Sequence, residues 1–557
     1  MDPEEARRIV LQYHRRSEHS PAAYARSLGY LDWASQPEPF RHFEGAERIL
    51  LERPSLSDSP PYGALSCPRS ISPAGIDHAS VSRLLYDSLS LSAWKQAGET
   101  RWSLRVNPSS GNLHPIEAYV ACSPEAGFCE VPGLFHYDPS THSLARRLNL
   151  AEETWEKLCL SPGRNALLIG LTSIYWRESW KYGERAFRYC QLDLGHALAC
   201  LAVAAAGLGW SAGLVDPLAT EVLERVLGTW EQTGPEAEHA EALVLIAPDG
   251  RERPSRGVEP IRAEGLSSLV LETFGVPNRL SVRHVDWPVI DEVSAATEVT
   301  EVRTERCEGT GHDVWGHPGE ESEGSAGPSV SIRELVRQRR SAQAMDGVTS
   351  LDRKDFLRVV HRCVHASDRP PQEILPWSPT LSIACFVHRV RDMEPGLYLL
   401  LRRAGELDEY RRRLDPAFVW EGVDWPFGEP RLFLLRRGDY RGQARLAACG
   451  QEIASDGVVS FAMIADLRAA IERYGAWFYR RLFWEAGLLG QILYLEAEAA
   501  GIRGTGIGCY FDDLTRQLLG VKDRELECFY HFTLGGAVQD PRLQTLSAYG
   551  HLEPSSG

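Results

Sequence analysis

A loop of polar side chains enclosed by prolines is the stretch of this sequence best suited to hold a ligand. Residues 107–115 combine amide and hydroxyl groups with one glycine, and residues 116–120 follow with strand-like alternation. Prolines stiffen such a loop, while Ser and Asn side chains offer partners to the hydroxyl chain and ring edge of a ligand. The loop consists of Asn107, Pro108, Ser109, Ser110, Gly111, Asn112, Leu113, His114 and Pro115. It predicts a polar clamp, with an ordinary turn before a strand as the alternative.

A basic run after a helix-like segment could bind a phosphate. Arg339, Arg340, Ser341 and Gln343 follow a helical pattern at residues 331–336. Arginine suits a phosphate because its planar guanidinium donates two parallel, charge-assisted hydrogen bonds. The alternative is a solvated basic surface at the end of a helix.

A glycine-rich exit from a long apolar helix has two interpretations. Gly504, Thr505, Gly506, Ile507 and Gly508 do not have the Gly-x-Gly-x-x-Gly spacing of a dinucleotide fold, and no acidic residue follows at the ribose distance. The glycines either let a helix meet a strand closely or bring the main chain against a ligand.

Lys181 and Tyr182 are candidates for proton transfer. A lysine ahead of a buried helix can act as a base once it is desolvated, and a tyrosine can relay or accept a proton. The alternative is that Lys181 pairs with Glu178 or Glu184 while Tyr182 packs in the core.

The loop at residues 107–115 resembles the flavin-contacting loop of the nitroreductase-like flavoproteins, and most closely that of the azoline (thiazole/oxazole) dehydrogenases of peptide natural-product pathways. The resemblance implies FMN as the cofactor. Residues 339–343 are similar to the family's Arg-x-Ser-x-Arg/Lys signature, which would place Arg339 on the phosphate and Ser341 on the ribityl chain. Gln343 replaces the usual second basic residue, so phosphate affinity is expected to be weaker or supplemented elsewhere.

The same resemblance assigns roles to the other two motifs. Residues 504–508 would contact the isoalloxazine ring through the main chain, where an N–H can stabilise negative charge on the reduced ring. In azoline dehydrogenases the pair matching Lys181 and Tyr182 is implicated in removing the substrate proton while hydride leaves to flavin N5.

Two stretches of the chain repeat one pattern. Residues 181–188 recur as residues 473–480, and a long apolar helix with a glycine-rich exit follows each. The register continues in the pairs Asp193 with Glu485 and Gly195 with Gly487. The repeat predicts two diverged copies of one α+β unit.

Each copy lacks the motif that the other retains. Residues 84–95 of the first copy, taken as the counterpart of the arginine motif, contain no such arginine, and residues 375–382 of the second copy lack the glycine of the polar loop. Proteins of this superfamily build each flavin site across a dimer interface. The resemblance therefore implies one composite site in which residues 107–115 meet Arg339, Ser341 and residues 504–508, with one FMN per chain.

The expected fold class is α+β and nitroreductase-like: a mixed sheet flanked by helices, with a tandem duplication that forms an intrachain pseudo-dimer. The expected parts are an N-terminal accessory segment at residues 1–74, a first unit at 75–260, a partly disordered linker at 261–330 and a second unit at 331–548. Aromatic residues at 30–33 and 40–43 are expected to anchor the accessory segment by packing.

Composition excludes several other classes. The net charge of −16 without a lysine-rich tract argues against nucleic acid or an anionic membrane as partner. The acidic N-terminus has no apolar signal core, and twelve cysteines without a Cys-x-x-Cys pair fit a reducing cytoplasm. Residues 196–215 are apolar but alanine-rich and predict a buried core helix. His361, Cys363 and His365 have no evident fourth ligand, so no metal site is expected.

These observations predict a cytoplasmic FMN-dependent oxidoreductase that transfers hydride at flavin N5 and acts on a small-molecule or peptide substrate, such as an azoline. One alternative is a nitro or quinone reductase that uses NAD(P)H. Another is a non-catalytic protein that stores flavin or binds a partner, because one fold hosts many functions.

Overall fold

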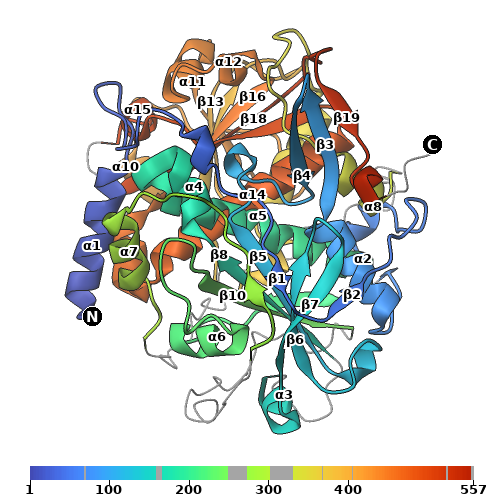
Figure 1. Cartoon of the computed structure of the whole chain (residues 1–557). Coiled ribbons are helices and arrows are strands. Elements are labelled where there is room, and N and C mark those ends of the chain that lie inside the picture. Colours follow the sequence, from blue (N-terminus) through green and yellow to red (C-terminus); the bar gives the residue numbers. More distant parts are fainter. Residues whose placement is uncertain are drawn as a thin grey trace.

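The structure is a computed structural model that describes residues 1–67, 70–158, 166–248, 273–300, 330–366, 368–403, 405–521 and 525–552. Two seven-stranded antiparallel sheets dominate it, one in the lower and one in the upper half of Figure 1. The first runs in the order β2 (Arg48–Leu50), β7 (Ser143–Asn149), β6 (Gly133–Asp138), β5 (Ile116–Cys122), β8 (Leu167–Ser173), β10 (His239–Ala247), β9 (Ser211–Leu214). The second runs β14 (Glu421–Gly422), β15 (Leu432–Arg437), β13 (Gly396–Leu400), β12 (Ser382–Val387), β16 (Val459–Asp466), β18 (Leu526–Gly535), β17 (Arg503–Ile507).

Six of the seven strands follow the same chain order in the two sheets, so the molecule contains two units of one topology. The edge strand differs: β2 comes from the N-terminal region, whereas β14 lies between β13 and β15 in the chain. In each unit a short helix and a 22-residue helix connect the same pair of strands. These helices are α4 (Tyr175–Tyr182) and α5 (Ala186–Gly207), and α13 (Leu467–Tyr474) and α14 (Phe478–Ala499).

The long helices α5 and α14 cross at a pair of glycines. A Cβ added to Gly195 would lie 2.3 Å from the backbone oxygen of Trp484, and one added to Gly487 would lie 2.2 Å from that of Leu192. Only glycine allows the backbones to come so close. The residues that the repeat paired thus meet each other at the centre of the molecule, and the two units pack as a pseudo-dimer.

Helix α5 belongs to the one helical stretch of the described residues that is long and apolar enough to cross a membrane. This stretch comprises residues 175–207, but 94% of its most apolar window is buried inside the protein. It is the core helix that the alanine-rich pattern predicted, and it ends at Gly207.

The N-terminal region is integrated into this core. Asp2 caps α1 (Pro3–Arg16) by accepting the N–H groups of Glu4 and Glu5. The hydroxyl of Tyr13 donates to the backbone oxygen of Glu184 at 2.7 Å, and its ring packs edge-on against Tyr479, so α1 touches both units.

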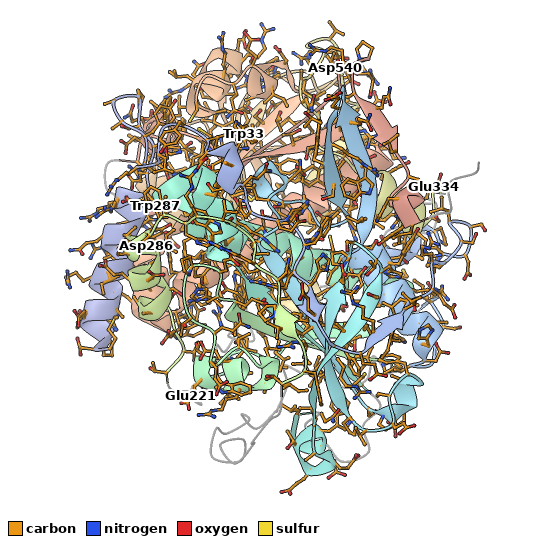
Figure 2. All side chains as sticks on the ribbon, viewed as in Figure 1. Trp33, Glu221, Asp286, Trp287, Glu334 and Asp540 are labelled. Carbon is orange, nitrogen blue, oxygen red and sulfur yellow. The ribbon has the colours of Figure 1, made fainter. Side chains whose placement is uncertain are left out.

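The aromatic residues expected to anchor the accessory segment divide into two groups. Phe40 and Phe43 are buried as predicted, whereas Tyr30 and Trp33 are more than 60% exposed. Trp33 is labelled in Figure 2.

Part of the expected linker has regular structure. Helix α7 (Pro288–Ala296) buries Ile290, Val293 and Ala296 and packs against α1. Residues 249–272 and 301–329, with the linker histidines His312 and His317, lie outside the described residues.

A small third sheet links the two units. The hairpin of β3 (Leu91–Ala97) and β4 (Thr100–Arg105) in the first unit pairs with β19 (Gln544–Leu546) near the end of the second (Figure 1).

The remaining elements, where they are described, cover the sheets. They are α2 (His78–Ser88), α3 (Glu152–Leu158), α6 (Thr220–Leu227), α8 (Ile332–Gln338), α9 (Arg353–Cys363), α10 (Leu407–Arg413), α11 (Arg441–Ala447), α12 (Ile453–Asp456), α15 (Asp512–Leu518) and the pair β1 (Phe43–Glu44) with β11 (Val276–Pro277), beside short 3₁₀ turns.

The packing corrects one proposed correspondence. Helix α2 packs on α5 as α9 packs on α14, so α2 and α9 are counterparts. Residues 84–95 therefore do not occupy the position of the arginine motif in the other unit. The error arose because short sequence patterns do not reveal packing partners.

Candidate functional site

The polar loop is fixed to the central helix by one carboxylate. The backbone N–H of Ser110 donates to both carboxylate oxygens of Asp193, at 3.1 and 3.2 Å, and its hydroxyl donates to Oδ1 at 3.2 Å. The hydroxyl of Ser109 accepts the N–H of His114 at 2.8 Å. Gly111, and unusually Asn112 and His114, have positive φ angles of 64°, 56° and 52°. Such strain persists only where the surroundings fix it, and it is concentrated at ligand-binding sites.

The loop and the Lys–Tyr pair are in contact. A Cβ added to Gly111 would lie 2.8 Å from the hydroxyl oxygen of Tyr182 and 2.9 Å from Nζ of Lys181. Among the described residues Lys181 forms no ion pair within 4 Å, although its charge acts on Glu178, and Glu184 pairs with Arg16. Lys181 is half-buried, and Tyr182 packs against the core.

Two buried carboxyl groups lie behind this pair. Glu178, three residues before Lys181 on α4, is fully buried beside Asp193. Burial and the neighbouring Asp193 raise the pKa of Glu178, while Lys181 opposes this shift. Burial raises the pKa of Asp193 to about 7 against the lowering effect of its bonds to Ser109 and Ser110. Two adjacent buried carboxyls cannot both ionise easily, so the pair holds a proton near neutral pH. The sequence pattern had offered Glu178 only as an ion-pair partner.

Arg339 of the second unit reaches the end of strand β4, which leads into the polar loop of the first unit. It is 4% exposed, and its Nη2 donates to the backbone oxygen of Arg105 at 3.1 Å, two residues before Asn107. Its guanidinium lies 5.0 Å from the centre of the Tyr494 ring. The two motifs that the sequence placed on separate copies therefore meet in one region.

Ser341 and the glycine strand lie side by side. Ser341 forms a parallel bridge with Gly504, and its hydroxyl lies 2.7 Å from that of Tyr494. The Tyr494 hydroxyl also accepts the N–H of Gly506 at 3.0 Å, so this main-chain donor already has a partner.

The glycines themselves are required by close neighbours. A Cβ at Gly506 would lie 1.9 Å from the Tyr530 hydroxyl, and one at Gly508 would lie 2.1 Å from the ring of Tyr189. The geometry therefore gives both glycines a packing role, and Tyr189 brings α5 of the first unit against the strand of the second. Ring contact through the main chain of Gly504, Thr505, Gly506, Ile507 and Gly508 stays a prediction.

A cluster of cations surrounds the arginine motif. Burial, together with the charges of Arg339, Arg337 and Arg503, lowers the pKa of Arg340 to about 9, and Glu498 opposes this shift. Lys95 on β3 also has a lowered pKa, from burial and from Arg340 and Arg503. Positive charge gathered in this way is stabilised by an anion.

Lys95 and Arg503 were missed as candidates. Arg503 directly precedes the glycine strand, which was a usable signal, whereas Lys95 is brought there only by the third sheet. Gln343 is exposed and adds no charge.

The counterpart position in the second unit carries its own ion pair. Glu485, which matches Asp193, accepts the N–H groups of Thr380 and Leu381 as well as the Thr380 hydroxyl. Glu485 also forms a buried ion pair with Arg402. A small cavity at this position is lined by Glu485, Arg402 and Trp377. The second unit thus keeps the carboxylate that accepts loop N–H groups, but Arg402 neutralises the charge of that carboxylate.

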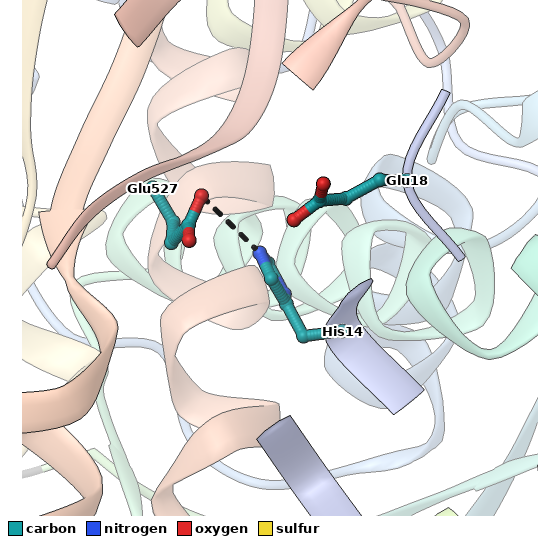
Figure 3. A group of neighbouring side chains, drawn as sticks. All are labelled: His14, Glu18 and Glu527. Atoms are coloured by element: carbon teal, nitrogen blue, oxygen red, sulfur yellow. Dashed lines mark ion pairs between the residues drawn. The ribbon is translucent and has the colours of Figure 1, made fainter. Parts of the chain in front are cut away.

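One other cluster has the composition of a metal site. His14, Glu18 and Glu527 have ligand atoms within 4.8 Å of one another (Figure 3). Arg516 forms ion pairs with both glutamates, and burial together with Arg188 lowers the pKa of His14 to about 4. The arginines take the place of a cation, so the cluster is an ion-pair network. His361, where no metal site was expected, stacks its ring on the ring of Phe427, with the ring centres 3.8 Å apart.

Comparisons with known proteins agree with this architecture. No family model matches the chain. A solved structure from Anabaena variabilis, a "putative nitroreductase", matches 95% of this chain and 99% of its own length, with a TM-score of 0.67 and 23% identity. The curated "Putative nitroreductase" of Methanocaldococcus jannaschii is 31% identical over 108 residues, which cover 18% of this chain and about half (52%) of that relative. The protein therefore has a nitroreductase-like fold.

Proposed function

We propose that the protein is an FMN-dependent oxidoreductase with one composite site per chain. The observation that carries the proposal is that Arg339 of the second unit bonds to the end of the strand that leads into the polar loop of the first, beside an excess of positive charge. The two units are proposed to descend from a tandem duplication, after which only one of two equivalent sites kept its binding groups.

The residues present fit a flavin phosphate and ribityl chain. Among the described residues, the buried Nε of Arg339 and Oδ1 of Asn107 have no hydrogen-bond partner, which is unusual for buried polar atoms and is relieved by a polar ligand. The phosphate would be held by Arg339, Arg340, Arg503 and Lys95. The ribityl hydroxyls and the ring edge would be held by Ser341 and the loop at residues 107–114. Bound FMN supplies hydride transfer at its N5 atom.

The residues of the first unit would handle the substrate proton. Nζ of Lys181, in its neutral form, would accept the proton from the substrate, and the hydroxyl of Tyr182 would relay it, since both groups lie at Gly111. The Glu178–Asp193 carboxyl pair stores a proton behind them and keeps the local charge low. We propose an azoline-type peptide or a related amine- or carbon-centred donor as substrate, on the resemblance of the loop and of the Lys–Tyr pair.

The first test is the flavin content of the purified protein. Arg339→Ala removes the buried guanidinium and should reduce bound flavin at least tenfold, because a charge-assisted bond to phosphate is lost. Arg542→Ala, which removes an arginine whose side chain is 86% exposed, is the matched control and should retain full flavin content. Wild-type protein saturated with FMN should bind about one flavin per chain by absorbance and protein assay. A ratio near two, or equal binding by both variants, contradicts the composite site.

The direction of electron flow is separable from flavin binding. Loaded protein should be reduced by an azoline-containing peptide in stopped-flow absorbance. Rapid bleaching by NAD(P)H with no response to the peptide would replace the dehydrogenase proposal by the reductase alternative.

A further inference from the structure

Two cysteines from distant parts of the second unit lie in contact beside the candidate site. Cys509 immediately follows the glycine strand, and Cys449 lies in the turn after α11. Their Sγ atoms are 2.9 Å apart, and both side chains are half-buried. A disulfide bond is about 2.05 Å long, so a movement of roughly 0.9 Å closes it.

The N-terminal segment supplies a hydrogen-bond donor to Cys509. Nδ1 of His19 accepts the N–H of Ala25 at 2.9 Å, which leaves the proton of the neutral ring on Nε2. The pKa of His19 is lowered, first by burial, so the ring is neutral at pH 7. Its remaining polar atom, an N–H, is therefore the one that donates to the Cys509 sulfur.

Positive charge adds to this effect. The buried Arg185 donates to the backbone oxygen of Gly508, directly before Cys509. The hydrogen bond with Cys449, together with His19 and Arg185 and against the opposing effect of burial, lowers the pKa of the Cys509 thiol to about 5. Cys509 is thus the thiolate of the pair, and Cys449, whose pKa is raised, is the thiol.

The pair has both partners that reversible thiol oxidation needs, a half-exposed thiolate and a resolving thiol. We propose that Cys449 and Cys509 form a peroxide-reactive dithiol that closes to a disulfide.

In the first step the Cys509 thiolate attacks one oxygen of hydrogen peroxide, the O–O bond breaks and hydroxide leaves, which gives a sulfenic acid. The Cys449 sulfur then attacks the Cys509 sulfur, so that an S–S bond forms, the S–O bond breaks and water leaves. Overall, two thiols lose two electrons and one peroxide becomes two waters.

The dithiol is coupled to the candidate site through the same segment. Residue Arg26, just beyond His19 and Ala25, accepts the N–H of Glu184 through its backbone oxygen, and a Cβ at Gly183 would lie 2.3 Å from that oxygen. The negative charge of Cys509 is among the causes that raise the pKa of Tyr182. Closing the disulfide removes this charge and so lowers the pKa of Tyr182.

The test is disulfide mapping on the full-length wild-type protein. Reduced protein is treated with one equivalent of hydrogen peroxide, alkylated and digested. The expected result is a peptide pair linked through Cys449 and Cys509 that dithiothreitol separates. Because this measurement needs neither flavin turnover nor a variant, its outcome is independent of the proposed function.

Variants identify the roles of the two sulfurs. Cys449→Ser should leave a sulfenic acid at Cys509 that dimedone traps. His19→Phe keeps a ring in place but removes the donor, and should slow oxidation about tenfold, as expected for one hydrogen bond to a charged group. Cys67→Ser removes an exposed thiol and should change nothing. The proposal is overturned if both thiols still alkylate after peroxide treatment, or if Cys67→Ser abolishes the link.

Discussion

At the scale of single residues, Asp193 and Glu485 show how one position serves two purposes. Both sit at the same register of a long helix and both accept the backbone N–H of a loop residue. Arg402 neutralises Glu485, whereas the pKa of Asp193 is raised by burial. The sequence identified this pair by its register, but it could not reveal Arg402, which comes from a strand-end residue 83 positions away.

The raised pKa of Asp193 predicts a pH-dependent stability. Its pKa is about 7 in the folded protein and about 3.8 when unfolded, so the folded state binds the proton more tightly. This contribution is complete below pH 4 and is lost as the pH rises through 7, by up to about 4 kcal/mol. Asp193→Asn cannot ionise, and the flavin-free variant should lose less stability than wild type between pH 4 and 7 in urea unfolding. Parallel stability profiles would show that Asp193 does not hold the proton.

Lys181 offers a test of proton transfer at the loop. Lys181→Ala should lower turnover of the peptide substrate by about 10²–10⁴, the range for a general base, and leave flavin content unchanged. The repeat provides its control: Arg473 occupies the matching position of the second unit and is exposed. Arg473→Ala should keep full activity, and equal activity of both variants would return Lys181 to a packing role.

At the scale of elements, the crossing of α5 and α14 decides how closely the units approach. Gly195→Ala places a Cβ 2.3 Å from a backbone oxygen, which cannot rotate away as a side chain would. The expected loss is about 1–3 kcal/mol of unfolding free energy, measured by urea titration. Gly207→Ala in the same helix would meet only a side-chain atom at 3.5 Å and serves as the control. An equally stable Gly195→Ala protein would mean that the helices can separate without cost.

Elements with a strong local signal were predictable from sequence. The helices α5 and α14, the helix before Arg339 and strand β5 appear where apolar periodicity placed them, because their burial follows directly from that pattern. Helix α7 was read as linker because its three buried residues are few and contact α1 from the far end of the chain. The place of Lys95 at the site could not be predicted either, because it depends on the pairing of β3 with β19.

At the scale of the whole molecule, the candidate site exists only because both units are present. The polar loop and the Lys–Tyr pair come from one unit, and the arginine motif and glycine strand come from the other. The complementary losses of the two copies predicted this joint site, although one of the assigned counterparts, residues 84–95, was wrong. The flavin stoichiometry of the intact chain tests directly whether the two units form one joint site.

The ion pair of Glu485 with Arg402 has a consequence for how the two halves of the chain evolve. In an assembly of identical subunits, every codon change alters both equivalent positions at once, so neither can change alone. In this chain Asp193 and Glu485 are encoded separately. A substitution that neutralises Glu485, as Arg402 does, therefore leaves the codons around Asp193 unchanged.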